Sequence, residues 1–179
     1  MALINTTTTG IQGSTFYADG TGDLTIQQNG QTINKITKNP TFRVFLNTNT
    51  NTTNDVFTKV PFNTKVFDTE NCFDVATNFR FTPNVAGYYQ INGATNTINA
   101  NTRHVIRLYK NGSSDSHGSD FISDSSTRML SSALISNIVY LNGSTDYVEL
   151  YVRQVSGTGV YGSATGEYTW MSGTLVRAA

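Results

Sequence analysis

Residues 115–124 contain the densest group of side chains that could do chemistry, namely Asp115, His117, Asp120 and Asp124. Three carboxylates and one imidazole within ten residues could bind a divalent cation, since hard cations such as Ca²⁺ prefer oxygen ligands, or they could present polar groups to a sugar. The segment lacks the ligand spacing of an EF-hand loop. We therefore predict a long solvated loop here and keep the four side chains only as candidate metal ligands.

Catalytic motifs are missing from the rest of the sequence. The chain has two histidines, His104 and His117, and one cysteine, Cys72, and it contains no Gly-x-Ser-x-Gly elbow, no His-Glu-x-x-His pair and no Gly-rich phosphate loop. A papain-like pairing of Cys72 with a distant histidine is the alternative. Free cysteine is among the most buried residue types, so we predict that Cys72 packs as a small hydrophobe. We expect neither enzymatic activity nor a cofactor.

The composition excludes several other classes of protein. Of the 179 residues, 62 are Thr, Asn or Ser, and 12 Lys or Arg balance 12 Asp or Glu. Because phosphate binding needs clustered cations, a chain with zero formal net charge offers no electrostatic case for nucleic acid. No apolar run approaches the roughly 18 residues of a membrane span. The first residues show neither the basic nor the apolar region of a secretory signal, so we do not expect secretion.

The pattern of apolar residues predicts an all-β chain. No window of about a dozen residues has the i, i+3, i+4, i+7 spacing of an amphipathic helix. Short runs rich in Val, Ile, Phe, Tyr and Thr alternate instead with Gly, Asn, Asp and Ser. Asn29-Gly30 predicts a hairpin between residues 24–26 and 32–36. Further strands are predicted at 42–46, 56–60, 62–67, 79–81, 88–98, 104–109, 131–141, 147–154 and 168–176, which favours a sandwich or a barrel.

Two of these predicted strands have faces of different character. In residues 147–153 the even positions are Val148, Leu150 and Val152, whereas the odd positions are Tyr, Glu, Tyr and Arg. Residues 104–110 alternate in the same way. An aromatic and charged outer face suits a sheet that a neighbouring subunit covers, although tyrosine on a solvated strand is also common.

The character of the chain changes near Pro40. Residues 1–40 carry four consecutive Thr and few bulky apolar groups, whereas residues 41–179 hold nine of the ten Phe and the single Trp170. Forty residues with so few large side chains cannot bury enough surface to be stable alone. We therefore predict an N-terminal attachment arm or hairpin at 1–40 and a domain with its own core at 41–179.

The order of motifs across residues 42–177 resembles the complement C1q-like domain. The motifs are Phe73-Asp74, Thr77-Asn78, Phe81-Thr-Pro83, Gly87-Tyr-Tyr89, Leu108-Tyr-Lys-Asn-Gly112, Ser132-Ala133 followed by Leu141 to Val148, and Met171-Ser-Gly-Thr-Leu175. The resemblance implies a ten-stranded jelly-roll sandwich, related to the tumour-necrosis-factor fold, that assembles as a tight homotrimer. It implies no catalytic activity.

The resemblance also assigns packing roles and shows departures. Asn78 stands where the family has a turn glycine, and one extra residue, Phe79, precedes the next strand. This departure affects the shape of a loop more than the fold. The residues expected to pack in the core or between subunits are Phe73, Phe81, Gly87, Tyr89, Leu108, Tyr147, Tyr151, Trp170 and Gly173.

The N-terminal arm carries a second resemblance. Residues 11–17 and 19–30 are similar to N-terminal segments of virion structural proteins of tailed phages, particularly phages of cyanobacteria. This similarity implies a protein that is made in the host cytoplasm and placed on the exterior of the virion. An uncharged, hydroxyl-rich arm could attach to other virion proteins by strand addition, in which main-chain hydrogen bonds supply affinity.

Two functions fit these expectations. In the first, which we favour, the chain is the trimeric knob of a tail fibre or baseplate appendage and binds a polysaccharide or protein of the host surface. In the second, the trimer is a capsid decoration protein that stabilises the head. A secreted C1q-like recognition module is a third function, which the missing secretory signal disfavours.

Overall fold

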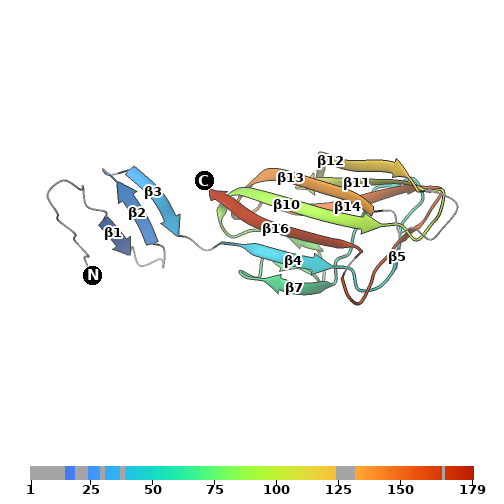
Figure 1. The fold of residues 1–179 in the computed structure, drawn as a ribbon, viewed down its shortest axis with the longest axis horizontal. Helices are drawn as coiled ribbons and strands as arrows, with labels where there is room; N and C mark the ends of the chain where they lie inside the picture. Colours follow the sequence, from blue (N-terminus) through green and yellow to red (C-terminus); the bar gives the residue numbers. More distant parts are fainter. Residues whose placement is uncertain (1–14, 19–23, 29–30, 37–38, 124–131, 167) are drawn as a thin grey trace. The chain divides into compact units, whose positions relative to one another are not determined.

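The structure, a computed structural model, describes residues 15–18, 24–28, 31–36, 39–123, 132–166 and 168–179. The chain divides into two compact units, Met1–Lys38 and Asn39–Ala179. Within the described residues every regular element is a β-strand (Figure 1). None of these residues forms a helix long and apolar enough to cross a lipid bilayer. The prediction of an all-β chain is confirmed.

The first unit contains a small antiparallel sheet in the order β1-β2-β3. Its strands are β1 (Thr15–Ala18), β2 (Leu24–Gln28) and β3 (Gln31–Ile36). The predicted hairpin is confirmed, because β2 and β3 pair with Leu24 opposite Ile36. The third strand, β1, was not predicted, since four residues are too few to show an alternating pattern. The turn residues Asn29 and Gly30 lie outside the described part of the chain.

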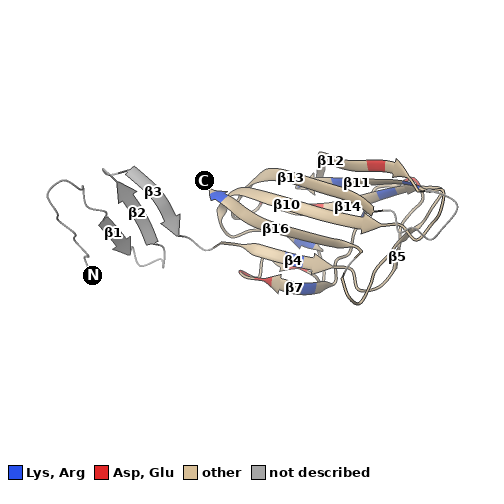
Figure 2. Ribbon diagram, viewed as in Figure 1, with Lys and Arg blue, Asp and Glu red and all other residues tan. Residues whose placement is uncertain are grey.

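Two large antiparallel sheets form most of the second unit, and charged segments are sparse on both (Figure 2). Sheet I runs β13 (Ser132–Asn142), β10 (Ala86–Asn96), β16 (Trp170–Ala178), β4 (Thr41–Phe45), β7 (Thr64–Asp68). Sheet II runs β12 (Ser113–Ile122), β11 (Arg103–Lys110), β14 (Val148–Val155), β9 (Arg80–Phe81), β8 (Phe73–Asp74). The short β6 (Thr58–Lys59) also pairs with β14, and β5 (Thr50–Asn51) pairs with β15 (Gly159–Val160).

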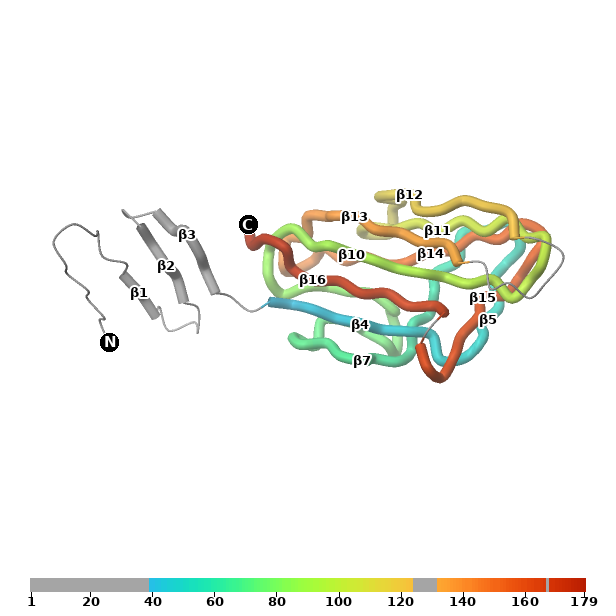
Figure 3. The backbone as a smooth tube through the Cα atoms, viewed as in Figure 1, coloured from blue at the N-terminus to red at the C-terminus, as the bar shows by residue number. Residues whose placement is uncertain are grey.

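The order of strands in sheet I brings the two ends of this unit together. The first strand, β4, pairs with the last strand, β16, so that Thr41 lies opposite Thr174. The entry to β4 and the C-terminus consequently lie at one end of the sandwich, whereas the loops around β5 and β15 lie at the other (Figure 3). Pairing of strands distant in sequence is typical of jelly rolls, and the predicted sandwich is confirmed.

Aromatic side chains fill the core between the two sheets. Phe42 stacks on Phe81 with ring centroids 4.4 Å apart, and Phe73 lies 5.1 Å from Phe42. Tyr89 is fully buried and contacts Phe81 edge-on at 5.5 Å. The inward face predicted for residues 147–153 is also confirmed, because its three aliphatic side chains are fully buried. The apolar residues that the sequence alternates along each strand therefore meet across one shared core.

The turn between β8 and β9 explains the departure at Asn78 and Phe79. The carboxylate of Asp74 accepts hydrogen bonds from the backbone nitrogens of Ala76, Thr77 and Asn78, at 2.9 to 3.0 Å. These bonds stabilise the charged form and lower the pKa of Asp74 well below its usual range. The extra residue, Phe79, takes a left-handed conformation with φ of 51°. Glycine is therefore not needed at position 78, because the backbone turns one residue later.

Candidate functional site

The segment predicted as a solvated loop is a strand. Ser113–Ile122 forms β12, which pairs with β11 at the edge of sheet II. Serine, aspartate and glycine rarely favour strands, so the prediction was wrong for a physical reason: β11 offers a free row of backbone hydrogen-bonding groups that outweighs local preference. Two register shifts accommodate the poor fit along the pair.

The candidate metal ligands on β12 do not converge. Asp120 accepts a hydrogen bond from Nε of Arg103 at 2.8 Å, and Asp115 accepts one from Nδ2 of Asn137 at 3.1 Å. His117 is exposed and lies opposite Arg107 on β11. Asp124 lies outside the described residues. Among the residues that are described, no three His, Cys, Asp or Glu side chains are grouped so that they could hold a metal ion.

The nine residues that were expected to pack in the core or between subunits lie in different environments. Phe73, Phe81, Tyr89 and Leu108 are buried in the core, whereas Tyr147, Tyr151 and Trp170 are half-buried on outer faces. Gly87 and Gly173 are buried where backbones and side chains approach closely. A Cβ at Gly173 would lie 2.6 Å from Cε1 of Phe42, and one at Gly87 would lie 2.4 Å from the carbonyl oxygen of Arg177.

The aromatic outer face of β14 is partly covered by the chain itself, and its tyrosines stay half-buried. Tyr151 stacks on Tyr109 with centroids 3.9 Å apart, and Phe57, from the segment before β6, lies 6.2 Å from Tyr109. Glu149 is only 3% exposed and accepts a hydrogen bond from Nζ of Lys59 at 2.7 Å. Burial, together with Glu149, raises the pKa of Tyr151 to about 12. Intramolecular packing thus covers part of a face for which the sequence left two alternatives, a neighbouring subunit and solvent.

Exposed apolar side chains gather instead on the outer face of sheet I. Tyr88 of β10 and Tyr140 of β13 are opposite each other, with ring centroids 5.5 Å apart, and they are 48% and 40% exposed. Ile138 and Leu134, farther along β13 on the same face, are 54% and 55% exposed, and Val176 of β16 is 57% exposed. We call these five residues the sheet I face. Large apolar groups gathered on one side of a sheet are typical of an interaction surface.

Neutral polar groups occupy the middle of the sheet I face. Nε2 of Gln90 donates hydrogen bonds to Oδ1 of Asn92 at 3.1 Å and to Oγ of Ser136 at 2.9 Å. Opposite Asn92 on the neighbouring strand lies Ser172. Amide and hydroxyl groups can pair with the same groups of a second copy, and they bring no like charges together.

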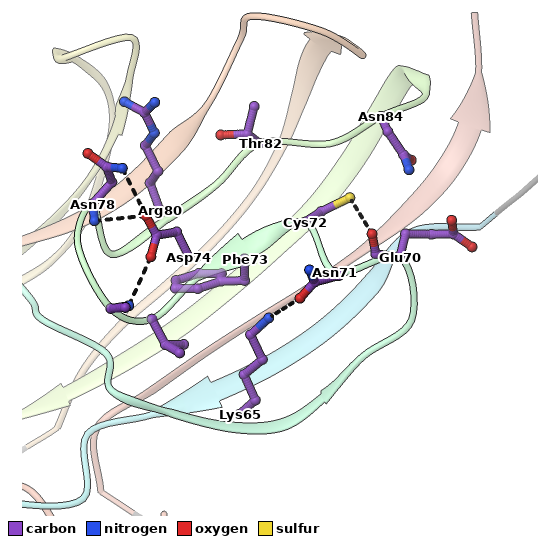
Figure 4. A pocket seen from close by; sticks show the side chains of 12 residues that line it. Lys65, Glu70, Asn71, Cys72, Phe73, Asp74, Asn78, Arg80, Thr82 and Asn84 are labelled. Atoms are coloured by element: carbon purple, nitrogen blue, oxygen red, sulfur yellow. Dashed lines mark hydrogen bonds between the residues drawn. The ribbon is translucent and has the colours of Figure 1, made fainter.

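A separate pocket of about 690 Å³ lies beside β7, β8 and β9. Figure 4 shows the side chains that line it, among them Lys65, which donates to Asn71 at 2.7 Å, and Cys72. Burial raises the pKa of the Cys72 thiol, which keeps it protonated and a poor nucleophile. No histidine lines the pocket, so it brings together no cysteine–histidine pair. The prediction that Cys72 is buried is confirmed.

A buried polar network at His104 was not predicted from the sequence. His104 is fully buried, with Nε2 2.8 Å from Oγ1 of Thr95 and Nδ1 3.1 Å from Nε2 of Gln154. Because the amide nitrogen of Gln154 can only donate, Nδ1 accepts and Nε2 carries the proton. Burial lowers the pKa of His104 to about 4, so the ring is neutral. The alternation of residues 104–110 was the one available signal, since it places His104 on the inward face.

The arrangement of the second unit is similar to that of several solved structures. The globular domain of zebrafish complement 1qA protein has 17% identity and a TM-score of 0.54, covering 78% of this chain and 99% of that one. Murine APRIL has 11% identity and a TM-score of 0.55, covering 78% and 100%. Eiger TNF from S. frugiperda has 12% identity and a TM-score of 0.56, covering 78% and 93%. At these identities the likeness establishes the C1q- and TNF-like fold.

No protein-family model matches this chain, and no curated protein matches it. The fold therefore rests on the arrangement of the strands, and the function has to be argued from the surfaces that they present.

Proposed function

We propose that this chain is a non-enzymatic binding module that assembles as a homotrimer through the sheet I face. The observation that carries the proposal is the set of large apolar side chains exposed there, with Tyr88, Tyr140 and Ile138 between 40% and 54% exposed. Burying one such side chain contributes about 1.5–3 kcal/mol. The number of copies comes from the resemblance to C1q-like domains, in which the trimer is the assembled form.

The charges on and around this face suit association of identical copies. The five residues of the sheet I face are uncharged, and its middle consists of Gln90, Asn92 and Ser136. Two cations lie beside Tyr88 and Tyr140: Arg177, opposite Tyr88, and Lys110, which is paired with Asp146. In a closed three-fold ring each copy meets its neighbours through two different patches, and a neutral sheet I face can pack on either an apolar or a polar patch of the next copy without burying an unpaired charge. Hydroxyl and amide groups can then form hydrogen bonds across the interface.

Substituting Ile138→Asp is expected to dissociate the trimer. An unpaired carboxylate buried at each interface should weaken association by roughly 100-fold or more. Analytical ultracentrifugation of the full chain at micromolar concentration measures this. The matched control is Ile122→Asp, because Ile122 is 74% exposed but lies on β12 at the edge of sheet II. A wild-type chain that sediments as a folded monomer would refute the proposed assembly.

The biological setting that we propose is the exterior of a tailed-phage virion, where the trimer forms the knob of a tail fibre or baseplate appendage. The resemblance of residues 11–30 to phage virion proteins supports this setting. Because β4 begins beside the end of β16, a trimer attached through residues 1–40 would leave the loops at the far end of the sandwich free. The alternative is a capsid decoration protein, which would use the same arm and the same trimer.

The location can be tested by imaging the virion with an antibody or gold label directed at residues 41–179. A tail knob is expected at the tail tip in tens of copies per particle, since only a few fibres are present. A decoration protein would cover the head in hundreds of copies. Labelling of neither structure, with the protein absent from purified particles, would contradict both assignments.

A further inference from the structure

Arg107 carries a positive charge that no described carboxylate neutralises. It is half-buried on the outer face of β11, and its Nε is the one buried side-chain nitrogen or oxygen without a hydrogen-bond partner among the described residues. A buried polar group left without a partner costs about 1–3 kcal/mol. Contact with the ring of Phe57 offsets part of this cost, but the guanidinium has no hydrogen-bond or carboxylate partner among the described residues, so Arg107 is a candidate for contact with something outside the chain.

Three neighbouring cations on this face differ from Arg107 because each of them already has a carboxylate partner. Their ion pairs are Lys59–Glu149, Arg103–Asp120 and Arg153–Asp55. In register with Arg107 on β12 lies His117, which adds no negative charge. Arg107 therefore leaves a net positive potential on this part of sheet II, and it helps to lower the pKa of Asp120, after the larger effects of Arg103 and Arg153.

Aromatic rings hold the Arg107 guanidinium in place. The ring of Phe57 lies 4.2 Å from its central carbon, and Phe57 in turn lies 6.2 Å from Tyr109. Tyr109 stacks on Tyr151, which is directly opposite Arg107 in the β11–β14 pair. A guanidinium stacked on a ring keeps its donors in one plane and loses little entropy when it binds a planar acceptor. We call Phe57, Arg107, Tyr109 and Tyr151 the Arg107 cluster.

We propose that the Arg107 cluster binds a carboxylate-bearing sugar unit of an acidic polysaccharide. A guanidinium forms two parallel hydrogen bonds with a carboxylate, and the tyrosine rings offer a flat apolar surface with polar tips beside it. The cluster lies on the outer face of sheet II, on the opposite side of the sandwich from the sheet I face. Three clusters on one trimer can engage a repeating polymer together, which strengthens weak single contacts. The inference rests on the proposed binding role and names its ligand class.

Binding of the full chain to polygalacturonate, a carboxylated polymer, tests the proposal by biolayer interferometry. Wild type is expected to bind polygalacturonate and not neutral dextran. Arg107→Gln should weaken binding at least tenfold, and Arg107→Lys should recover only part of it, because an ammonium lacks the planar pair of donors. The matched control is Arg80→Gln. Arg80 lies 4.1 Å over the ring of Tyr147 in a similar stack but has no buried unpartnered nitrogen.

Several results would overturn the proposal. The first is that wild type and Arg107→Gln bind polygalacturonate equally well, and the second is that Arg80→Gln weakens this binding as much as Arg107→Gln does. The third is that wild type binds polyphosphate but not polygalacturonate, which would assign the site to phosphate. Thermal unfolding of each variant separates loss of binding from loss of fold. Sedimentation separates this proposal from the proposed trimer: a monomer whose weaker binding still depends on Arg107 would refute the trimer and retain the site.

Discussion

Lowering the pH from 7 to 4 is expected to destabilise the folded chain by about 3 kcal/mol through His104 alone. The ring is fully buried, and its pKa is lowered from 6.5 to about 4 in the folded state. Between these two values the unfolded chain binds a proton that the folded chain does not. Stability contributed by the neutral ring is therefore complete above pH 6.5 and decreases as the pH falls toward 4.

Urea unfolding at pH 7, 6, 5 and 4, at one fixed protein concentration, measures this effect. His104→Gln is expected to be less stable than wild type at pH 7, because the hydrogen bonds to Thr95 and Gln154 change, but to lose less stability on acidification. His117→Gln is the matched control, since His117 is exposed and should leave the pH dependence intact. Equal acid sensitivity in wild type and His104→Gln would contradict the role assigned to the buried ring.

Substituting Phe81→Ala is expected to destabilise the second unit by about 3–5 kcal/mol, which is typical of removing a buried aromatic ring. Phe81 is fully buried and contacts both Phe42, at 4.4 Å between ring centroids, and Tyr89, at 5.5 Å. Its removal leaves a cavity between the two sheets that neither neighbour can fill without leaving its own position.

Chemical denaturation followed by fluorescence of the single Trp170 measures this loss. The control is Phe67→Ala, because Phe67 is 44% exposed on the edge strand β7 and should cost less than about 1 kcal/mol. Equal losses in the two variants would show that the contacts of Phe81 do not dominate the core.

The sequence predicted most of the strands because their apolar residues alternate with a period of two. Its prediction failed at β12, where Ser, Asp and Gly form a strand only because the edge of β11 is available to pair with them. The same limit applies to the metal site suggested by Asp115, His117 and Asp120. Closeness along the chain does not bring side chains together when each of them already has a different neighbour in the sheet.

The surfaces were harder to predict than the strands. Alternation along residues 147–153 correctly separated an inward from an outward face, but it could not tell what would cover the outward one. Phe57 and Lys59, some ninety residues earlier in the chain, cover much of it. Tyr88 and Tyr140 lie in two predicted strands that are far apart in sequence, and their pairing on an open face depends on the register between β10 and β13.

By itself the amino-acid sequence determined that this chain is all-β, that residues 1–40 differ in character from the rest, and which face of residues 147–153 points into the core. These properties depend on local composition and on the alternation of apolar and polar residues with a period of two, and both can be read from consecutive residues. The tertiary structure alone decided which outer face stays open, where Arg107 is left without a carboxylate, and that His104 is buried. Each of these depends on contacts between strands distant in sequence, and only for His104 did a local pattern, the alternation of residues 104–110, carry a signal.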